Sequence, residues 1–547
     1  MRRSLLKSIF ATLMLVFVSS LAFSQGVTTA SIQGLVTDNS GETLPGANVV
    51  AVHTPSGTRY GAVTNIEGRF VLPNIRVGGP YTVTISYVGF EDRVVEGINL
   101  ALGQNFNINA VLTDGLDLEA VEVLAGRGGI LDADRTGAAL NIGSEKINSL
   151  PTVTRSVSDF TRLTPQSNGN AFAGTSSRFN NFTIDGNIYN NNFGLGNAQF
   201  AGGNPVSLDA IEEIQVNLAP FDVRQGGFTG AGVNAITRSG DNTFRGSAYY
   251  FLRNDQMQGT KIGDNFIPQN DAKNEILGFR LGGPIIKDKL FFFVNYETET
   301  ELRPSILRRA ARDGETPDGL FISRVPLSEA NFVRDQLQSI YGYDAGAPDS
   351  YPFASEQTRL NVRLDYNINN NNKLTVRYND YSAFTDVPTN GNSIRYIQTR
   401  FRNTNRTGIE GINFRNANYT NDRNVKSFVA ELNSRIGNNM SNQLNIGYTA
   451  IQDPKRGVPG GQNFPFVEVL EPDDAGNLLY YMSMGNELFT VGNLLENNIL
   501  NITNNFSLFK GKHTYTFGGN FEYMTFDNAF NPVFNGFYRF NSYDSFV

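Results

Sequence analysis

The sequence predicts an all-β protein in which a β-sandwich is followed by a mixed, glycine-rich domain and then by an incomplete antiparallel barrel. Three observations support this fold class. The 55 Gly residues and the repeated Asn runs mark many turns. The segments between these turns alternate polar and apolar residues with a period of two. In the C-terminal half, short and long connections alternate between the expected strands.

The composition excludes several classes of function. The chain contains no Cys, which rules out disulfide frameworks, Cys-ligated zinc and thiolate nucleophiles. Its two His residues, His53 and His513, have no metal-site spacing, and no catalytic constellation emerges elsewhere. We therefore expect no enzyme, no metal and no cofactor. A net charge of −7 also argues against a nucleic-acid partner, which would require a clustered basic surface.

Residues 1–24 have the pattern of a secretory signal peptide. Arg2 and Arg3 precede the apolar run 9–18, and small residues follow it, so we expect cleavage after Ser24. The apolar run is too short to span a bilayer comfortably, which disfavours a membrane anchor. The protein is therefore predicted to be exported.

Residues 26–113 are predicted to form a small β-sandwich. Alternating strands at 31–38 and 81–90 are separated by turn signals at hairpin spacing. The runs "GLVTDNSGETLPGANVVAV", "TNIEGRFVLPNI" and "YTVTISYVGFED" resemble the carboxypeptidase regulatory-like domain, a transthyretin-like sandwich also grouped with carbohydrate-binding-like folds. The resemblance implies docking, spacing or glycan contact, and it implies no peptidase activity.

Residues 114–125 are predicted to link this sandwich to a plug-like region at 126–243. In that region we expect Ser207 to cap a short helical turn before the strand 212–219. The stretch "GAGVNAITRSG" (230–240) has the glycine content of a phosphate-binding loop but lacks its Lys and its following helix. Its alternation instead predicts a strand whose glycines allow another backbone or a wall to come close.

Residues 244–547 are predicted to form the first part of a barrel. In "RLNVRLDY" (359–366), Leu360, Val362 and Leu364 share one face, and polar residues share the other. A soluble sandwich would turn the polar face to water, whereas an outer-membrane barrel would turn it to a hydrated lumen. The nine expected strands lie near 245–253, 275–283, 289–298, 357–367, 373–382, 425–435, 442–451, 498–509 and 513–526.

The connection lengths favour the barrel. Short turns on the periplasmic side and long loops on the outer side are typical of bacterial outer-membrane barrels. The short links are 284–288, 368–372, 436–441 and 510–512, and the long ones are 254–274, 299–356, 383–424 and 452–497. In the longest loop we expect a helix over 328–342, begun by Ser328, ended by Gly342 and packed through Phe332, Val333, Leu337, Ile340 and Tyr341.

The order of these regions resembles a TonB-dependent outer-membrane receptor of the Bacteroidota type, in the Oar-like branch. The run "IEEIQVNLAPFDVRQGGFTGAGVNAITRSGDNTFRGSAYYFLRN" (211–254) is similar to that family's plug end and first barrel strand. The family's plug fills a closed barrel with many more strands than the nine expected here. The resemblance therefore implies a chain truncated at its C-terminus.

The resemblance also implies a Ton box, a short segment that adds as a strand to the sheet edge of TonB. The run "LEAVEV" lies at the family's position for it and is similar to the form "LDEVVV", from which Ala120 and Glu122 depart. The alternative is a plain linker strand. The candidate residues are Leu118, Glu119, Ala120, Val121, Glu122 and Val123.

The function implied by the resemblance is import of a scarce glycan, peptide or metal chelate across the outer membrane. The implied partners are TonB with its inner-membrane energising complex, outer-membrane lipid, an unknown solute and, as an open alternative, a surface lipoprotein. Two other functions remain open at this point. One is a surface adhesion or assembly protein that uses the barrel as an anchor, and the other is a carbohydrate-binding module on a secreted scaffold.

Overall fold

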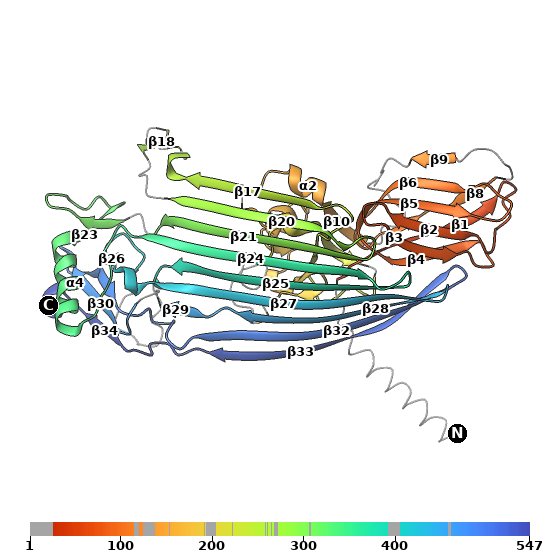
Figure 1. Ribbon diagram of the computed structural model, residues 1–547. Helices are drawn as coiled ribbons and strands as arrows, with labels where there is room; N and C mark the ends of the chain where they lie inside the picture. Colours follow the sequence, from red (N-terminus) through yellow and green to blue (C-terminus); the bar gives the residue numbers. More distant parts are fainter. Residues whose placement is uncertain are drawn as a thin grey trace, which may run out of the picture.

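A computed structural model describes three successive parts of the chain, a sandwich, a plug and a curved wall of strands (Figure 1). The predicted signal segment 1–24 lies outside the described residues. None of the described helices is both long and apolar enough to cross a bilayer. The described residues are 26–113, 120–123, 137–152, 154–190, 192, 204–220, 222–257, 259, 261–263, 265–266, 272–305, 308–391, 405–457 and 461–547.

The N-terminal part is a β-sandwich with one apolar core, as predicted. One sheet has the order β4-β1-β7, with β8 also paired to β1, and the other has the order β3-β2-β5-β6-β9. Alternate residues such as Ile32, Val36, Val83 and Ile85 point inward and are fully buried. The strands are β1 Ala30–Asp38, β2 Asn48–His53, β3 Thr58–Val63, β4 Arg69–Ile75, β5 Gly78–Ser86, β6 Arg93–Leu100, β7 Asn105–Asn107, β8 Ala110–Leu112 and β9 Ala120–Val123.

The plug contains a five-stranded mixed sheet in the order β10-β15-β16-β13-β14. Ser207 caps a helical turn before β15, as predicted, because its side chain accepts a hydrogen bond from the Asp209 amide. The strand expected in the glycine-rich stretch is β16. The elements are β10 Gly137–Gly143, α2 Ser144–Ser149, α3 Val157–Thr161, β11 Ser167–Asn168, β12 Ala171–Phe172, β13 Asn181–Ile184, β14 Asn187–Ile188, β15 Ile211–Pro220 and β16 Gly232–Thr237.

The wall consists of nine long antiparallel strands that curve around one side of the plug (Figure 1). All nine predicted strands are present, and most are longer than expected at the loop end. The long strands are β17 Arg245–Asn254, β20 Lys273–Ile286, β21 Leu290–Pro304, β24 Pro352–Asn367, β25 Asn372–Val387, β27 Tyr419–Ile436, β28 Met440–Gln452, β32 Leu494–Lys510 and β33 His513–Ala529. The short strand β29, Lys455–Gly457, pairs beside β27.

Burial in the wall is the reverse of burial in a soluble sandwich. On β24, Arg359 and Arg363 are 3% and 5% exposed, whereas Leu364 between the polar positions is 39% exposed. The polar side chains face the plug, and the apolar ones face outward, where lipid would lie. This arrangement confirms the barrel interpretation of the alternating segments.

The two ends of the wall differ as the connection lengths predicted. The short turns lie beside the sandwich, and the long loops gather at the opposite end (Figure 1). There they form a compact cap with its own apolar core, which includes Val333, Leu337, Val469 and Met482. Its elements are β22 Arg309–Ala311, β23 Ile322–Pro326, α4 Leu327–Tyr341, β26 Ile412–Asn413, β30 Phe466–Pro472, β31 Leu478–Met484, β34 Phe537–Phe540 and α5 Tyr543–Phe546. The pair β18 Lys261–Ile262 and β19 Asn265–Phe266 stands apart from it.

The predicted loop helix is present as α4, but its buried face is narrower than expected. Val333 and Leu337 are buried, whereas Phe332, Ile340 and Tyr341 are exposed, so the prediction that all five pack inward was wrong for these three. The helix ends at Gly342, which adopts the left-handed conformation, as predicted. Ser328 does not cap it, because the helix starts one residue earlier and Pro326 occupies the cap position.

Candidate functional site

The candidate Ton box lies at an edge of the sandwich. Ala120–Val123 form β9, which pairs in parallel with β6 and aligns Val121 with Val94. This corrects the expectation that the segment is independent of the sandwich, because part of it is the fifth strand of a sandwich sheet. Leu118 and Glu119 lie outside the described residues. Turn chemistry could not have predicted the pairing, because a parallel pair is not joined by a hairpin.

A buried charge cluster joins the plug to the wall. Plug Asp185 accepts hydrogen bonds from the amide and hydroxyl of Thr237, at 2.9 and 2.8 Å. Arg377 on β25 lies 3.5 Å from Asp185 and 2.8 Å from Glu431 on β27. Arg363 on β24 donates to the Thr237 carbonyl at 2.7 Å. The pairing and the hydrogen bonds offset the cost of burying these charges.

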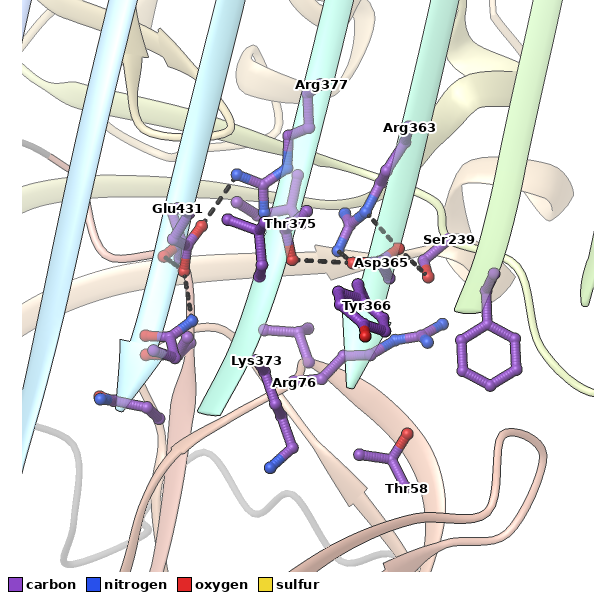
Figure 2. Close-up of a pocket in the computed structure, with 18 of the residues that line it drawn as sticks. Thr58, Arg76, Ser239, Arg363, Asp365, Tyr366, Lys373, Thr375, Arg377 and Glu431 are labelled. Carbon is purple, nitrogen blue, oxygen red and sulfur yellow. Dashed lines mark hydrogen bonds and ion pairs between the residues drawn. The ribbon is translucent and has the colours of Figure 1, made fainter. Parts of the chain in front are cut away.

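The cluster continues toward the end of the wall that carries the short turns (Figure 2). Asp365 accepts two parallel hydrogen bonds from Arg363, at 2.9 and 3.0 Å. It also accepts from Thr375 on β25 at 2.9 Å and from Ser239, just beyond β16, at 2.5 Å. These side chains line a cavity of about 60 Å³, which sandwich residues such as Arg76 close from the opposite side. The cavity is therefore the meeting point of all three parts of the protein.

A second polar cluster attaches the plug nearer the cap. Ser207 donates to Glu297 on β21 at 2.9 Å, and Tyr249 on β17 donates to the same carboxylate. Arg359 pairs with Glu297 at 2.9 Å and donates to the Asn204 carbonyl at 2.8 Å. Polar contacts thus join the plug to the wall at two heights, through ion pairs at Asp185 and through hydrogen bonds at Ser207 and Asn204.

Asn187 is a plug residue whose side chain fits closely into the wall. Its amide donates to Ser427 at 2.7 Å and to Thr449 at 2.8 Å. A Cβ atom at Gly447 would collide with this side chain, so only glycine leaves room for it. Gly240 has a similar role, because a Cβ there would lie 2.8 Å from the Gly283 carbonyl of β20. The predicted close approach of plug glycines to a wall is therefore confirmed at Gly240.

The sandwich contacts the plug through the loop that follows β6. The Leu102 amide donates to Glu213 at 3.0 Å, and its carbonyl accepts from Gln215 at 2.7 Å and Asn141 at 3.1 Å. Burial raises the pKa of Glu213 to about 7, although the hydrogen bonds from Leu102 and Asn141 act in the opposite direction. A buried carboxyl group that changes protonation near neutral pH therefore joins the sandwich to the plug.

The sandwich also contacts the short turns of the wall. Asn367 donates to the Thr58 hydroxyl at 3.0 Å, and the Lys373 ammonium lies 4.1 Å from the centre of the Tyr60 ring. Just before β17, the backbone N–H of Asn242 donates to the Pro55 carbonyl at 3.0 Å. A neighbouring cavity of about 300 Å³ is lined by His53, Arg76, Arg238, Arg245, Arg280 and other residues of the three parts.

The sequence did not identify these contact residues individually. It did predict the inward polar face of the wall that supplies Arg359 and Arg363, but not their partners on the plug. Those partners lie in turn-like runs such as "TIDGN", where an Asp before Gly reads as an ordinary turn residue. Among the described residues, no group of three or more His, Asp or Glu side chains could hold a metal ion.

Comparison with known families defines the class of protein. Residues 236–310 and 324–546 match the outer membrane beta barrel domain family, and residues 31–113 match the carboxypeptidase regulatory-like domain family. The first match covers more than half of the chain. The chain therefore belongs to the outer-membrane β-barrel family and resides in the outer membrane, with a carboxypeptidase regulatory-like domain at its N-terminal end.

Among curated proteins, the chain is similar to the TonB-dependent transporter Oar of Myxococcus xanthus. The two are 26% identical over 382 residues, which is 66% of this chain and 34% of Oar. It is also 28% identical over 133 residues to the TonB-dependent receptor SusC of Bacteroides thetaiotaomicron, covering 24% of this chain and 12% of SusC. This chain thus spans about a third of the length of the first relative.

Two solved structures resemble the chain at low sequence identity. The outer membrane transporter YddB of Escherichia coli has a TM-score of 0.47 and 11% identity, covering 71% of this chain and 48% of YddB. A mutant of the ferric enterobactin receptor PfeA of Pseudomonas aeruginosa has a TM-score of 0.44 and 14% identity, covering 72% of this chain and 50% of PfeA.

Proposed function

We propose that the protein is a TonB-dependent outer-membrane transporter that imports a scarce solute by moving its plug. The observation that carries the proposal is the polar attachment of the plug to the wall. Asp185 meets Arg377 through an ion pair, and Ser207 meets Glu297 through a hydrogen bond. When the plug moves, hydrogen bonds to water can replace these polar contacts, which lowers the cost of separating them. Separating a fully apolar interface would instead expose its whole apolar surface to water, at a free-energy cost that grows with the area. The TonB-dependent relatives support the same function.

The energy would come from the inner-membrane proton gradient through TonB and its energising complex. TonB binding by strand addition needs a backbone edge, and β9 lies at the end of its sheet, so among the described residues its outer edge has no partner strand. In the chain, β9 lies between the sandwich and the plug. A pull on β9 therefore acts on both neighbours through the covalent chain. The solute would be a glycan, a peptide or a metal chelate.

The experiment compares a backbone change with a side-chain change in β9. Val121→Pro removes an N–H donor and fixes φ, so it should abolish TonB binding and energised uptake. Glu122→Ala keeps the backbone and should leave both nearly unchanged. Uptake of a panel of labelled glycans, peptides and iron chelates is measured in cells, and binding is measured between the receptor and the C-terminal domain of TonB.

Because β9 pairs with β6, display at the cell surface and thermal unfolding of the sandwich are measured for both variants. Uptake that survives Val121→Pro at normal display would contradict the assignment of these residues to TonB coupling.

A surface adhesion or assembly protein is the second candidate, and the cap is the observation that favours it. The cap folds around its own core and exposes Phe332, Ile340 and Tyr341 along α4. Replacing Phe332 and Tyr341 with Ser should reduce cell-surface adhesion without changing uptake if the cap binds a surface partner. Loss of adhesion, together with no TonB-dependent uptake of any solute in the panel, would favour this second function over transport.

A further inference from the structure

The segment Gly26–Thr29 is a buried part of the N-terminal region. It precedes β1 and leaves the sandwich to lie between the plug and the wall. Val27, Thr28 and Thr29 are 4%, 7% and 6% exposed, although they belong to no regular element. A segment at the start of a domain usually frays unless specific contacts hold it.

The contacts of this segment with the plug involve two strands of the plug sheet. The Val27 carbonyl accepts a hydrogen bond from the Asn234 amide of β16 at 2.6 Å. Asn234 in turn accepts from the Thr183 hydroxyl of β13 at 2.9 Å. The segment is thus tied to the middle of the plug sheet. Along the chain, Thr183 lies two residues before Asp185 of the buried charge cluster, and Asn234 comes directly before Ala235.

The contacts with the wall reach the buried charge cluster. The Thr28 hydroxyl donates to Glu431 on β27 at 2.9 Å and accepts from Gln443 on β28 at 2.9 Å. Glu431 also pairs with Arg377, which lies 3.5 Å from plug Asp185. A continuous chain of polar contacts therefore runs from the N-terminal segment through the wall and into the plug.

From this arrangement we propose that Gly26–Thr29 is a latch that clamps the plug to the wall and is withdrawn with the sandwich when the plug opens. The proposal rests on the proposed transport function and deepens it by adding a third component to the plug attachment. A latch of this kind is an autoinhibitory contact. Its two ends grip different bodies, so the plug cannot leave the wall without breaking the bonds of Val27 or of Thr28.

The sandwich is suited to withdraw the latch as a unit. Gly26–Thr29 continues directly into β1, whose Ile32 and Val36 are fully buried in the sandwich core. Displacing the sandwich therefore pulls on the latch through the continuous chain. The same displacement breaks the contacts of Leu102 with Glu213 and Gln215. One movement of the sandwich would thus release both of its attachments to the plug.

The test uses hydrogen exchange in the full-length receptor, in isolated outer membranes and without TonB. Thr28→Val removes both hydrogen bonds of the latch to the wall while keeping its shape. Gln443→Leu removes one of them from the wall side, together with the hydrogen bond from Gln443 to Glu431 at 3.1 Å, and leaves the N-terminal region unaltered. We expect the amides of β13 and β16 to exchange about tenfold faster in either variant, as loss of a hydrogen bond to a charged network would allow.

The matched control is Thr29→Val. Thr29 is equally buried, but its hydroxyl has no hydrogen bond to any described residue, and only its carbonyl accepts, from the Gly103 amide at 3.1 Å. This variant should exchange like the wild type. Equal exchange in Thr28→Val, Gln443→Leu and Thr29→Val would overturn the latch, because the segment would then act only by filling space.

A second readout measures leakage in living cells. In a strain without TonB, a loosened plug should admit vancomycin, so the Thr28→Val and Gln443→Leu variants should lower the inhibitory concentration severalfold at equal display. Unchanged sensitivity together with unchanged exchange would overturn the proposal. Neither readout depends on uptake, so failure of the latch leaves the transport proposal standing, and failure of transport does not affect these measurements.

Discussion

The backbone amide of Leu102 donates to the buried carboxyl group of Glu213 at 3.0 Å, and this contact joins the sandwich to the plug. Glu213 is 5% exposed. The group is therefore placed where its protonation state affects the attachment of one domain to the other.

This contact should weaken as the pH rises. Burial raises the pKa of Glu213 to about 7, above its ordinary value of 4.5, so the docked state binds a proton more tightly than the open state. Stability should be greatest below the ordinary pKa and should fall between these two values, by at most about 3 kcal/mol. The free energy of opening is measured by hydrogen exchange around Leu102, corrected for the intrinsic effect of pH. Glu213→Gln should remove the dependence, and a wild type that is equally stable at pH 5 and pH 8 would contradict the prediction.

The pairing of β6 with β9 should control energy coupling. Val94 and Val121 are register partners, and the chain has no Cys, so Val94→Cys with Val121→Cys introduces one defined disulfide. If TonB takes β9 from β6, the oxidised receptor should lose uptake and recover it after reduction. Each single Cys variant is the control and should transport normally. Full uptake by the oxidised receptor would show instead that TonB adds to the outer edge of β9 while β9 stays on the sandwich.

The two faces of α4 should respond differently to the same type of substitution. Leu337 is buried in the cap core, so Leu337→Ser should destabilise the cap by about 3 kcal/mol through a cavity and a buried hydroxyl. Phe332 is exposed, and Phe332→Ser should cost less than about 1 kcal/mol. Protease cleavage of the cap on intact cells should therefore rise for Leu337→Ser only. Equal cleavage of the two variants would mean that α4 does not pack as described.

A buried ion pair should hold the cap loops together. Arg406 and Glu468 are both fully buried and lie 3.2 Å apart, and Arg539 also pairs with Glu468 at 2.7 Å. Glu468→Ala leaves two arginines without their carboxylate and should destabilise the cap by about 3 to 5 kcal/mol.

The control is the exposed pair of Arg334 and Asp335, where Asp335→Ala should have almost no effect. Thermal unfolding of the cap is monitored by proteolysis at increasing temperature, and this measurement distinguishes Glu468→Ala from Asp335→Ala. An equally small effect of Glu468→Ala would show that the buried pair contributes nothing.

The local periodicity of the sequence predicted the wall well, and the reason is physical. A strand that separates lipid from a polar interior must alternate, so "RLNVRLDY" reveals both its structure and its two faces. Contacts between distant segments leave no such mark. Asp185 and Arg377 are paired only because the plug sits at one height in the wall, and β9 reaches β6 only after the chain has turned back. The buried face of α4 was overestimated for the same reason, since periodicity marks an apolar stripe but not how much of it a neighbour covers.

The fit of Asn187 against Gly447 also restricts how the protein can be assembled. The side chain sits between β27 and β28 and bonds to both, in a recess that exists because Gly447 has no side chain. Sliding a finished plug along the axis of a finished barrel would force Asn187 past the side chains that flank this recess. A sideways approach meets no such obstacle while the strands are still open on one side. The order of biogenesis should therefore be plug first and wall second, with β27 and β28 folding around a plug sheet that has already formed.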